Sequence, residues 1–355
     1  MPSFDEQYAS FRVDVQASLD AFMHVHGQQL LGISRELAPA LESLATLLSG
    51  GKRLRPACSY WGYLAAGGRP GPAIINASAS LELLQASALI HDDVMDHSDT
   101  RRGLPAVHRQ FEARHLTDQW HGLSTDFGAA AAILIGDLAL VWSDAMLFES
   151  GFDDDALRRA KQIFDIMRTE LMAGQFLDVA EQARGGGSVD RALRVMRFKT
   201  TAYTIERPLH LGAALAGASA AVFEAFTAFG IPLGEAFQLR DDVLGVFGDP
   251  ALTGKPAGDD VREGKRTVLI ALAQESATPA QAQVLDAFVG DKLLDDAGLA
   301  TVQDVLRDTG ALAEVESRIA RNRDAALAAL DDSSLHEDGV IALKHIALAA
   351  TDRDF

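Results

Sequence analysis

The sequence has one cysteine, Cys58, among its 355 residues. A single cysteine cannot form a disulfide framework or a cluster of thiolate metal ligands within one chain, and this scarcity is typical of a reducing compartment. The sequence also has few positively charged residues. It contains 32 Lys and Arg and 50 Asp and Glu, so its net charge is −18. Nucleic acids and anionic membranes require a basic surface, so we expect neither as a partner.

The sequence also lacks a recognisable secretory or membrane-spanning segment. The first 27 residues are acidic and show no basic start followed by an apolar core. The longest apolar runs, near 127–136 and 211–223, are shorter than the ~20 residues that cross a bilayer. We therefore expect a cytoplasmic protein without a membrane span.

What the sequence does contain is helical periodicity. Apolar residues recur at three- and four-residue spacing in segments rich in Ala, Leu, Glu and Arg, namely 79–90, 156–181, 189–205 and 312–330. The Gly- and Pro-containing breaks between such segments are short, and none resembles a flexible linker. We expect an all-α protein of ten or more helices that forms a single domain over residues 1–355.

Two acidic clusters are the first candidate sites. Asp92, Asp93 and Asp96 end an apolar helical segment, and positions 92 and 96 lie within about 40° of each other on one helix face. The second cluster contains Asp241 and Asp242. Each cluster fits either a solvated acidic turn or a site for a hard divalent cation such as Mg²⁺.

Cationic residues stand near both clusters in the sequence. Arg101 and Arg102 follow the first cluster, and Lys255 and Lys265 follow the second. A separate loop, GGKRLRP at 50–56, places three cations after two glycines, without the spacing of a Walker loop. Carboxylates that hold metals, together with Arg and Lys that reach phosphate, are the parts needed to bind a diphosphate.

In this order the motifs resemble those of the trans-isoprenyl diphosphate synthases, the polyprenyl synthetase family, and in particular bacterial geranylgeranyl diphosphate synthases. The resemblance covers about residues 50–267 and includes GGKRLRP at 50–56, LLQASALIHDDVMDHSDTRRG at 83–103, GQFLD at 174–178, KTTAYT at 199–204, FQLRDD at 237–242 and the segment 248–267. It implies an isoprenoid synthase fold, in which antiparallel helices surround a deep central cavity and the acidic motifs face each other across its mouth. It also implies a homodimeric, chain-elongating prenyltransferase that joins isopentenyl diphosphate to an allylic diphosphate, either dimethylallyl, geranyl or farnesyl.

The resemblance implies a role for each motif residue. Three Mg²⁺ ions would be held or supported by Asp92, Asp93, Asp96, Asp178, Asp241 and Asp242. The allylic diphosphate would be neutralised by Arg101, Lys199 and Lys255, with Lys265 as a further substrate-binding cation. Isopentenyl diphosphate would bind Lys52, Arg55, Gln85 and Arg102. The side chains near the reacting carbons would be Thr200, Tyr203 and Gln238.

Two positions bear on metal binding and product length. Gly245 stands where the family commonly has a third aspartate, so we expect activity to survive with a weaker third metal. The floor of the product cavity would be formed by Ser87 and Ala88, which are too small to block a growing chain, with Leu84 about 5.4 Å deeper. We therefore expect a twenty-carbon geranylgeranyl product, with a farnesyl or longer polyprenyl product as the alternative.

Three rival functions remain open from the sequence. His91 beside Asp92 suggests an HD-type metal phosphohydrolase, although ~100° of helical rotation separates the two side chains and favours a packing role for His91. A class I terpene cyclase shares the acidic motif but needs no isopentenyl pocket. A non-catalytic subunit of a heteromeric synthase tends to lose one acidic motif.

Overall fold

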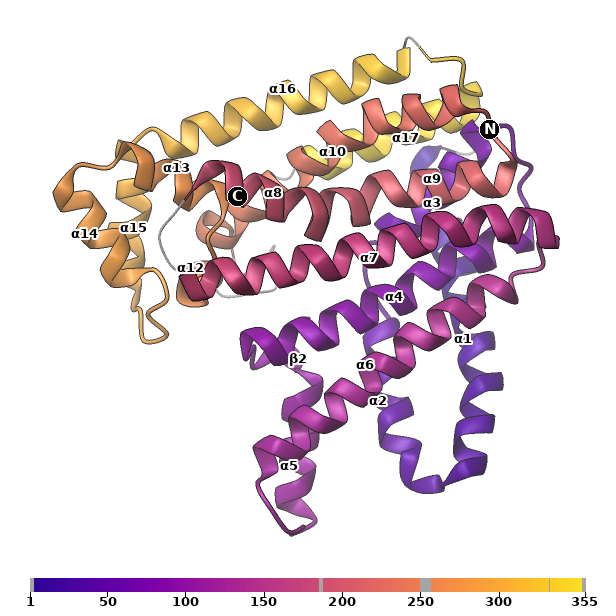
Figure 1. Ribbon diagram of the computed structural model, residues 1–355, viewed down its shortest axis with the longest axis horizontal. Coiled ribbons are helices and arrows are strands. Elements are labelled where there is room, and N and C mark those ends of the chain that lie inside the picture. The colour runs from indigo at the N-terminus through magenta and orange to yellow at the C-terminus, as the bar shows by residue number, and fades with distance from the viewer. Residues whose placement is uncertain (1–2, 185–187, 250–256, 332, 353–355) are drawn as a thin grey trace. The chain divides into compact units, whose positions relative to one another are not determined.

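The computed structural model is almost entirely helical, which confirms the all-α prediction (Figure 1). It describes residues 3–184, 188–249, 257–331 and 333–352. Within these ranges the only strands are β1 (Thr100–Arg101) and β2 (Leu104–Pro105), which form a small antiparallel hairpin. The contacts divide the chain into two compact units, Met1–Lys161 with Leu211–Gly217, and Gln162–His210 with Ala218–Phe355. The single domain stays a prediction.

The first unit is built around the central helix α4. Its elements are α1 (Phe4–Ile33), the 3₁₀ turn η1 (Arg35–Leu37), α2 (Ala38–Leu48), α3 (Leu54–Ala65), α4 (Pro72–Asp96), α5 (Val107–Thr117), α6 (Ser124–Phe148) and the start of α7 (Asp154–Arg184). Helix α4 contacts α1, α2, α3, α5 and α6. Leu81, Leu83 and Leu84 of α4 are fully buried, as expected of a helix that is apolar around most of its surface. This packing holds the end of α4, which carries the first acidic cluster.

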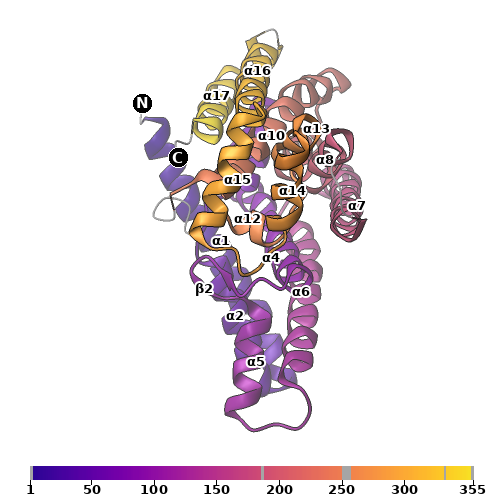
Figure 2. The ribbon, with the colours of Figure 1, turned by 90° about the vertical axis from the view of Figure 1, so that its left-hand side faces the viewer.

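The second unit contains most of α7 and the C-terminal helices. Its further elements are α8 (Val189–Met196), the π-helix η2 (Arg197–Glu206), the start of α9 (Arg207–Ala216), α10 (Ala220–Phe247), α12 (Asp259–Arg262), α13 (Val268–Ser276), α14 (Pro279–Phe288), α15 (Asp296–Asp308), α16 (Ala311–Asp331) and α17 (Glu337–Thr351). Helix α10 packs against both η2 and α16. Helices α16 and α17 lie side by side (Figures 1 and 2).

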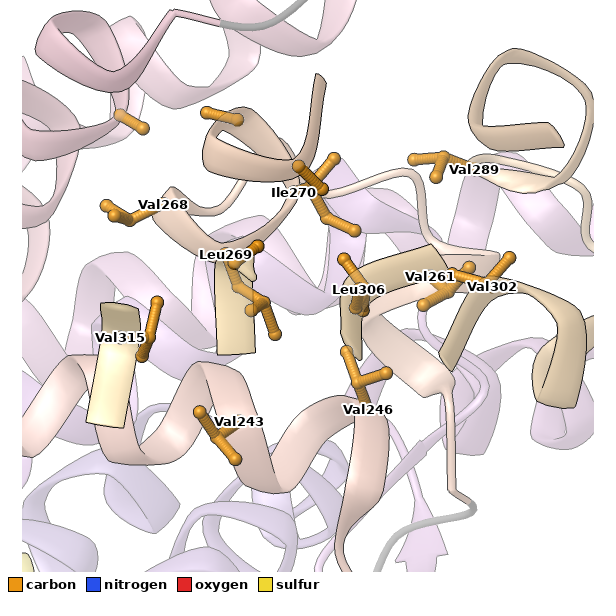
Figure 3. Packing of buried hydrophobic residues seen from close by; sticks show 14 of the residues in the cluster. Val243, Val246, Val261, Val268, Leu269, Ile270, Val289, Val302, Leu306 and Val315 are labelled. Atoms are coloured by element: carbon orange, nitrogen blue, oxygen red, sulfur yellow. The ribbon is translucent and has the colours of Figure 1, made fainter. Parts of the chain in front are cut away.

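A compact apolar cluster fixes the C-terminal half of α10. Val243 and Val246 point from α10 toward Leu269 of α13, Leu306 of α15 and Val315 of α16 (Figure 3). All five side chains are at most 1% exposed. The second acidic cluster immediately precedes Val243, so this core anchors the turn of α10 that carries it.

Three of the described helices are long and apolar enough to cross a membrane by length and composition: α4, α6 and α10. They exceed the uninterrupted apolar runs of the sequence because each helix also contains isolated polar residues, such as Glu82 in α4, Asp137 in α6 and Glu235 in α10. In α4, 67% of the window is buried inside the protein, against 44% in α6 and 33% in α10. The absence of a membrane span therefore stays a prediction.

Candidate active site

The first acidic cluster occupies the last turns of α4. Asp93 is buried, whereas Asp92 and Asp96 are partly exposed. The helix ends at His97, which adopts a left-handed conformation with φ of 56° and donates its N–H to the carbonyl of Asp93. Carboxylates at the negative end of a helix dipole are electrostatically unfavourable. This end of α4 therefore favours cations.

Arg101 of the hairpin supplies one such cation. Its Nε donates to Oδ1 of Asp93 at 2.9 Å, and its Nη2 contacts the same oxygen and lies 4.0 Å from Oδ2 of Asp92. The hairpin turns on Arg102 and Gly103, which both have positive φ, as a two-residue type I′ turn requires. The structure thus brings Arg101 to the first acidic cluster, where the sequence predicted a diphosphate-binding cation.

The same turn directs Arg102 toward the basic loop. Its Nη1 donates to the carbonyls of Leu47 at 2.7 Å and Gly50 at 2.9 Å. A Cβ on Gly51, whose φ is +114°, would lie 3.0 Å from Nη2 of Arg102. Burial lowers the pKa of Arg102; the charge of Glu82 opposes this effect, and neighbouring arginines reinforce it: Arg53, Arg101 and Arg55. A concentration of positive charge therefore surrounds the glycine turn, where the sequence predicted the isopentenyl diphosphate pocket.

One cation of the basic loop has a different role. Arg53 is 4% exposed and has a φ of 57°. Its guanidinium forms an ion pair with buried Glu82 of α4, contacts the carbonyl of Leu48 and donates to Oε1 of Gln16 at 2.5 Å. Arg53 thus ties the loop to α4, whereas Lys52 and Arg55 on either side of it were predicted to bind substrate. Gln85, also predicted to bind substrate, lies partly buried one turn after Glu82.

The predicted floor residues lie deeper along α4. Leu84 and Ser87 are fully buried, and Ala88 is partly exposed. Ser87 and Ala88 precede the first aspartate by about one turn, as the sequence expectation required. At the level of Ser87 and Ala88 helix α4 therefore carries only small side chains, and the larger Leu84 lies one turn further from Asp92.

The His91 side chain packs against α6. Its Nε2 lies 3.2 Å from the carbonyl oxygen of Ile133 and 3.5 Å from Oδ1 of Asp137. A Cβ on Gly136 would lie 2.2 Å from the same nitrogen, so the close packing of His91 on α6 needs glycine there. This geometry agrees with the packing role predicted for His91.

In the second unit, Lys199 and Asp178 form an ion pair. The Nζ of Lys199 donates to Oδ2 of Asp178 on α7 at 2.6 Å. The backbones approach closely, because a Cβ on Gly174 would lie 2.3 Å from the backbone nitrogen of Lys199. The structure thus joins a predicted diphosphate-binding cation to a predicted metal-supporting carboxylate.

Lys199 belongs to the π-helix η2, which also carries Thr200 and Tyr203. The helical segment predicted over 189–205 is therefore present, but from Arg197 onward it is a π-helix rather than an α-helix. Tyr203 is 2% exposed, and η2 packs closely on α10, where a Cβ on Gly234 would lie 2.7 Å from Cγ2 of Thr201. Helices α7 and α10 both approach η2 through glycine, so non-local packing accompanies the wider turn.

The second acidic cluster lies near the end of α10. Asp241 is partly exposed, and Asp242 is 4% exposed. Burial raises the pKa of Asp242 well above its usual value, and the charges of Asp260 and Asp241 raise it further. A hydrogen bond from Gln238 acts in the opposite direction and lowers this pKa. The Nε2 of Gln238 donates to Oδ1 of Asp242 at 2.7 Å. The amide predicted to lie near the reacting carbons is thus held by the acidic cluster.

Asp260 of α12 also lies near this cluster, and its role was not predicted from the sequence. Its Oδ1 accepts from Nζ of Lys265 at 3.1 Å, and Lys265 also lies 2.6 Å from Oε2 of Glu263. The carboxylate of Asp260 lies directly against Gly245, the position where the family commonly has a third aspartate. Lys255, predicted to bind the allylic diphosphate, lies outside the described residues.

The carboxylates of the acidic clusters are suitable ligands for Mg²⁺ ions whose coordination shells are completed by a substrate. Among the described residues, no group of three or more His, Cys, Asp or Glu side chains forms a ready cage for a metal ion. Mg²⁺ needs no such cage, because it usually binds one or two carboxylates and completes its shell with water and substrate phosphates. The oxygen-only donors of Asp92, Asp96 and Asp241 suit this hard cation.

Carboxylates and cations lie together at the end of α4, beside η2 and near the end of α10. The comparisons define the class of protein to which this chain belongs. The sequence model of the polyprenyl synthetase family matches residues 38–306. The geranylgeranyl diphosphate synthase of Mycobacterium tuberculosis is 34% identical over 305 residues, 84% of this chain and 79% of that protein. The geranylfarnesyl diphosphate synthase of Aeropyrum pernix is 34% identical over 280 residues, 78% of this chain and 81% of that protein.

A solved structure gives the same result. The geranylgeranyl pyrophosphate synthase of Corynebacterium glutamicum, complexed with isoprenyl diphosphate and magnesium, is 44% identical and superimposes with a TM-score of 0.94 over 98% of this chain and 99% of that chain. The chain belongs to the polyprenyl synthetase family and has the isoprenoid synthase fold. It is a trans-prenyltransferase of isoprenoid biosynthesis that elongates prenyl chains.

Proposed function

We propose that this prenyltransferase makes geranylgeranyl diphosphate from isopentenyl diphosphate and an allylic diphosphate. The observation that carries the proposal is the floor of small residues on α4, where Ser87 and Ala88 precede the first acidic cluster and the larger Leu84 lies one turn deeper. A floor at Leu84 suits a product longer than fifteen carbons. Similarity to enzymes named for twenty- and twenty-five-carbon products supports this range.

Two groups of residues would hold the diphosphates. Arg101 and Lys199, now paired with Asp93 and Asp178, would turn to the allylic diphosphate as it binds, and Lys255 and Lys265 would add positive charge. Isopentenyl diphosphate would bind the cationic turn through Lys52, Arg55, Arg102 and Gln85. Holding two polyanions together requires this concentration of positive charge in an otherwise acidic chain.

Mg²⁺ would be held by the carboxylates of Asp92, Asp93, Asp96, Asp241 and Asp242, with Asp178 in support, and three ions are expected with diphosphate bound. When bound, it supplies positive charge that stabilises a departing diphosphate. The similar Corynebacterium glutamicum enzyme was solved with magnesium and isoprenyl diphosphate, which supports the assignment.

The chain's own residues would promote ionisation of the allylic carbon–oxygen bond and protect the cation that results. Arg101 and Lys199 stabilise negative charge as it develops on the leaving diphosphate. The hydroxyls of Thr200 and Tyr203 and the amide of Gln238 present dipoles to positive carbon. The double bond of isopentenyl diphosphate then attacks the cation, and the product loses a proton to the released diphosphate, so no side chain acts as a nucleophile.

The test is a chain-length measurement on the purified protein. It is incubated with Mg²⁺, isopentenyl diphosphate and, separately, dimethylallyl, geranyl or farnesyl diphosphate. We expect geranylgeranyl diphosphate from at least one starter. A product of fifteen carbons, or of more than twenty, contradicts the assigned length, and the lack of any elongation points to a non-catalytic subunit.

We also propose that the enzyme is a cytoplasmic homodimer. Leu134, Val141 and Phe148 recur every seven residues along α6, and each is at least 44% exposed. Side chains seven apart lie on one face of a helix. A second copy of the chain would cover this apolar stripe without a membrane.

A further inference from the structure

The π-helix η2 is the least regular element beside the predicted reaction groups. It extends for ten residues, Arg197–Glu206, and at its end the N–H of Arg207 donates to the carbonyl of Ala202, five residues earlier. π-helices usually appear as single turns, frequently at functional sites. A π-helix of ten residues therefore needs interactions that stabilise its wider turns relative to those of an α-helix.

An ion pair joins the first and last residues of η2. The Nη2 of Arg197 lies 2.7 Å from Oε2 of Glu206. Nine residues make about 2.5 turns of an α-helix, which would place these side chains on opposite faces. With hydrogen bonds from residue i to i+5, a π-helix has about 4.4 residues per turn, so nine residues complete about two turns and the side chains share a face. The pair thus matches the π register and not the α register.

The acidic end of this pair is anchored to α10. Glu206 is 2% exposed, and its Oε1 accepts from Oγ1 of Thr227 at 3.2 Å. Its backbone lies against Gly230, where a Cβ would approach Cα of Glu206 to 3.0 Å. Arg197 retains more exposure, with 24% of its side chain accessible. One end of η2 is therefore fixed by packing, and the ion pair ties the other end to it.

A buried ion pair is weak evidence for stability, because well-packed apolar residues of similar size often stabilise a protein equally well. The best-attested role of such pairs is to select one structural register over another.

In η2 the α-helical and π-helical registers differ in where they place the side chains between Arg197 and Glu206. A return to α-helical geometry would rotate Lys199, Thr200 and Tyr203 relative to α7 and α10.

We propose that Arg197 and Glu206 are positioning residues that select the π register of η2 and thereby aim Lys199, Thr200 and Tyr203. This inference rests on the roles proposed for those three residues in the elongation reaction. It assigns to the pair an effect on turnover that is separate from its effect on folding.

The decisive variant is the double substitution Arg197→Met/Glu206→Met, compared with each single substitution. Each single change removes one half of this pair and lowers the thermal midpoint, although Nη1 of Arg207 still lies 3.8 Å from Oε1 of Glu206. The double change removes both charges, so the midpoint recovers, but no ion pair selects the register. We expect kcat of the double variant to stay at least about tenfold below wild type, because small misplacements of reacting groups are costly, and the amide of Arg207 to exchange hydrogen faster.

Two controls and one substitute variant make the result specific. Arg318→Met/Glu314→Met removes an ion pair of the same 2.7 Å length from α16 and should leave both kcat and η2 exchange unchanged. Arg197→Lys keeps the charge and should keep kcat within about threefold of wild type, since a single point charge can still reach the carboxylate. If the double variant does not fold, Glu206→Gln with the same readouts takes its place.

A variant lacking the ion pair that retains wild-type kcat and wild-type exchange at Arg207 would overturn the proposal. Recovery of kcat together with stability in the double variant would also overturn it, because the pair would then be merely structural. A wild-type protein that makes no elongated product would instead contradict the proposed function. The exchange measurement would still decide whether the pair holds the π register.

Discussion

A Cβ added to Gly245 would lie 2.0 Å from Oδ2 of Asp260. The aspartate thus occupies the space that a side chain at position 245 would need. The family commonly has an aspartate at 245, whereas this chain has a glycine there and places a carboxylate of α12 beside it. Asp260 also accepts from Lys265, so a larger residue at 245 would disturb that contact as well.

We predict that Gly245→Ala destabilises the protein by about 1–2 kcal/mol, because the added methyl group displaces the carboxylate of Asp260. Urea unfolding measures the change. Gly32→Ala, on the exposed side of α1 with nothing within 4 Å of the added carbon, is the matched control and should be neutral or stabilising. The double variant Gly245→Asp/Asp260→Gly exchanges the positions of carboxylate and glycine. Its free energy of unfolding should be closer to that of wild type than the free energy of unfolding of Gly245→Asp. Equal free energies of unfolding for the double variant and for Gly245→Asp would contradict the steric argument.

The two arginines of the basic loop should separate folding from binding. Arg53→Met leaves Glu82 buried without its partner, and we expect a loss of about 3–5 kcal/mol in the free energy of unfolding. Arg55→Met should leave unfolding within about 1 kcal/mol of wild type, as for a residue outside the buried ion pair. It should raise the KM for isopentenyl diphosphate at least about tenfold and leave that for the allylic substrate nearly unchanged, through loss of one charge-assisted phosphate contact. A higher KM for both substrates would contradict the separate pocket.

Ser87→Phe should shorten the product. The aromatic ring would fill the level of the cavity about one turn before Asp92, so we expect fifteen carbons or fewer in place of twenty. Product length is measured by chromatography of the dephosphorylated prenyl alcohols, with circular dichroism to confirm folding. Val13→Phe introduces the same ring at a position of α1 that is 67% exposed and should leave the product unchanged. An unchanged distribution with Ser87→Phe would place the floor elsewhere.

Asp242 should make the metal-free protein less stable as pH rises. Its pKa in the folded protein is raised well above 3.8, mainly by burial. Between pH 3.8 and the folded-state pKa, the unfolded chain releases a proton that the folded chain retains, so the free energy of unfolding falls with increasing pH. In chelator, Asp242→Asn should be more stable than wild type near neutral pH, and the difference should vanish near pH 3. A variant less stable than wild type at neutral pH would contradict this assignment.

The apolar stripe on α6 provides a test of the dimer. Leu134→Glu/Val141→Glu places two charges on side chains that are 68% and 63% exposed, and should convert a dimer to monomer in light scattering. Val13→Glu on α1 should leave the mass unchanged. A wild-type monomer, or a dimer that survives the double substitution, would argue against this face.

The helical class and the existence of the helix that carries the first acidic motif could be predicted from the sequence, but its bounds could not, because the predicted segment 79–90 is part of the longer α4. An apolar three- and four-residue period identifies α4, and the helix continues through the acidic residues of HDDVMD as far as Asp96. Arg101 was also predictable, because it follows Asp96 by only five positions. These features depend on neighbours in the chain.

The remaining features depend on distant packing. Arg53 is indistinguishable from Lys52 and Arg55 until Glu82 of α4 is placed beside it. The wide turn of η2 accompanies close approach by glycines of α7 and α10, and the period of residues 189–205 gives no sign of it. The position of the Asp260 carboxylate beside Gly245 requires α12 to fold back on α10, which a single sequence does not reveal.

The most direct test is a crystal structure with Mg²⁺ and a non-hydrolysable allylic diphosphate analogue. We predict that carboxylate oxygens of Asp92, Asp96 and Asp241 each bind Mg²⁺ when the analogue is bound. A bound analogue with no metal ion on Asp92 and Asp96, or with none on Asp241, would contradict the proposed mechanism.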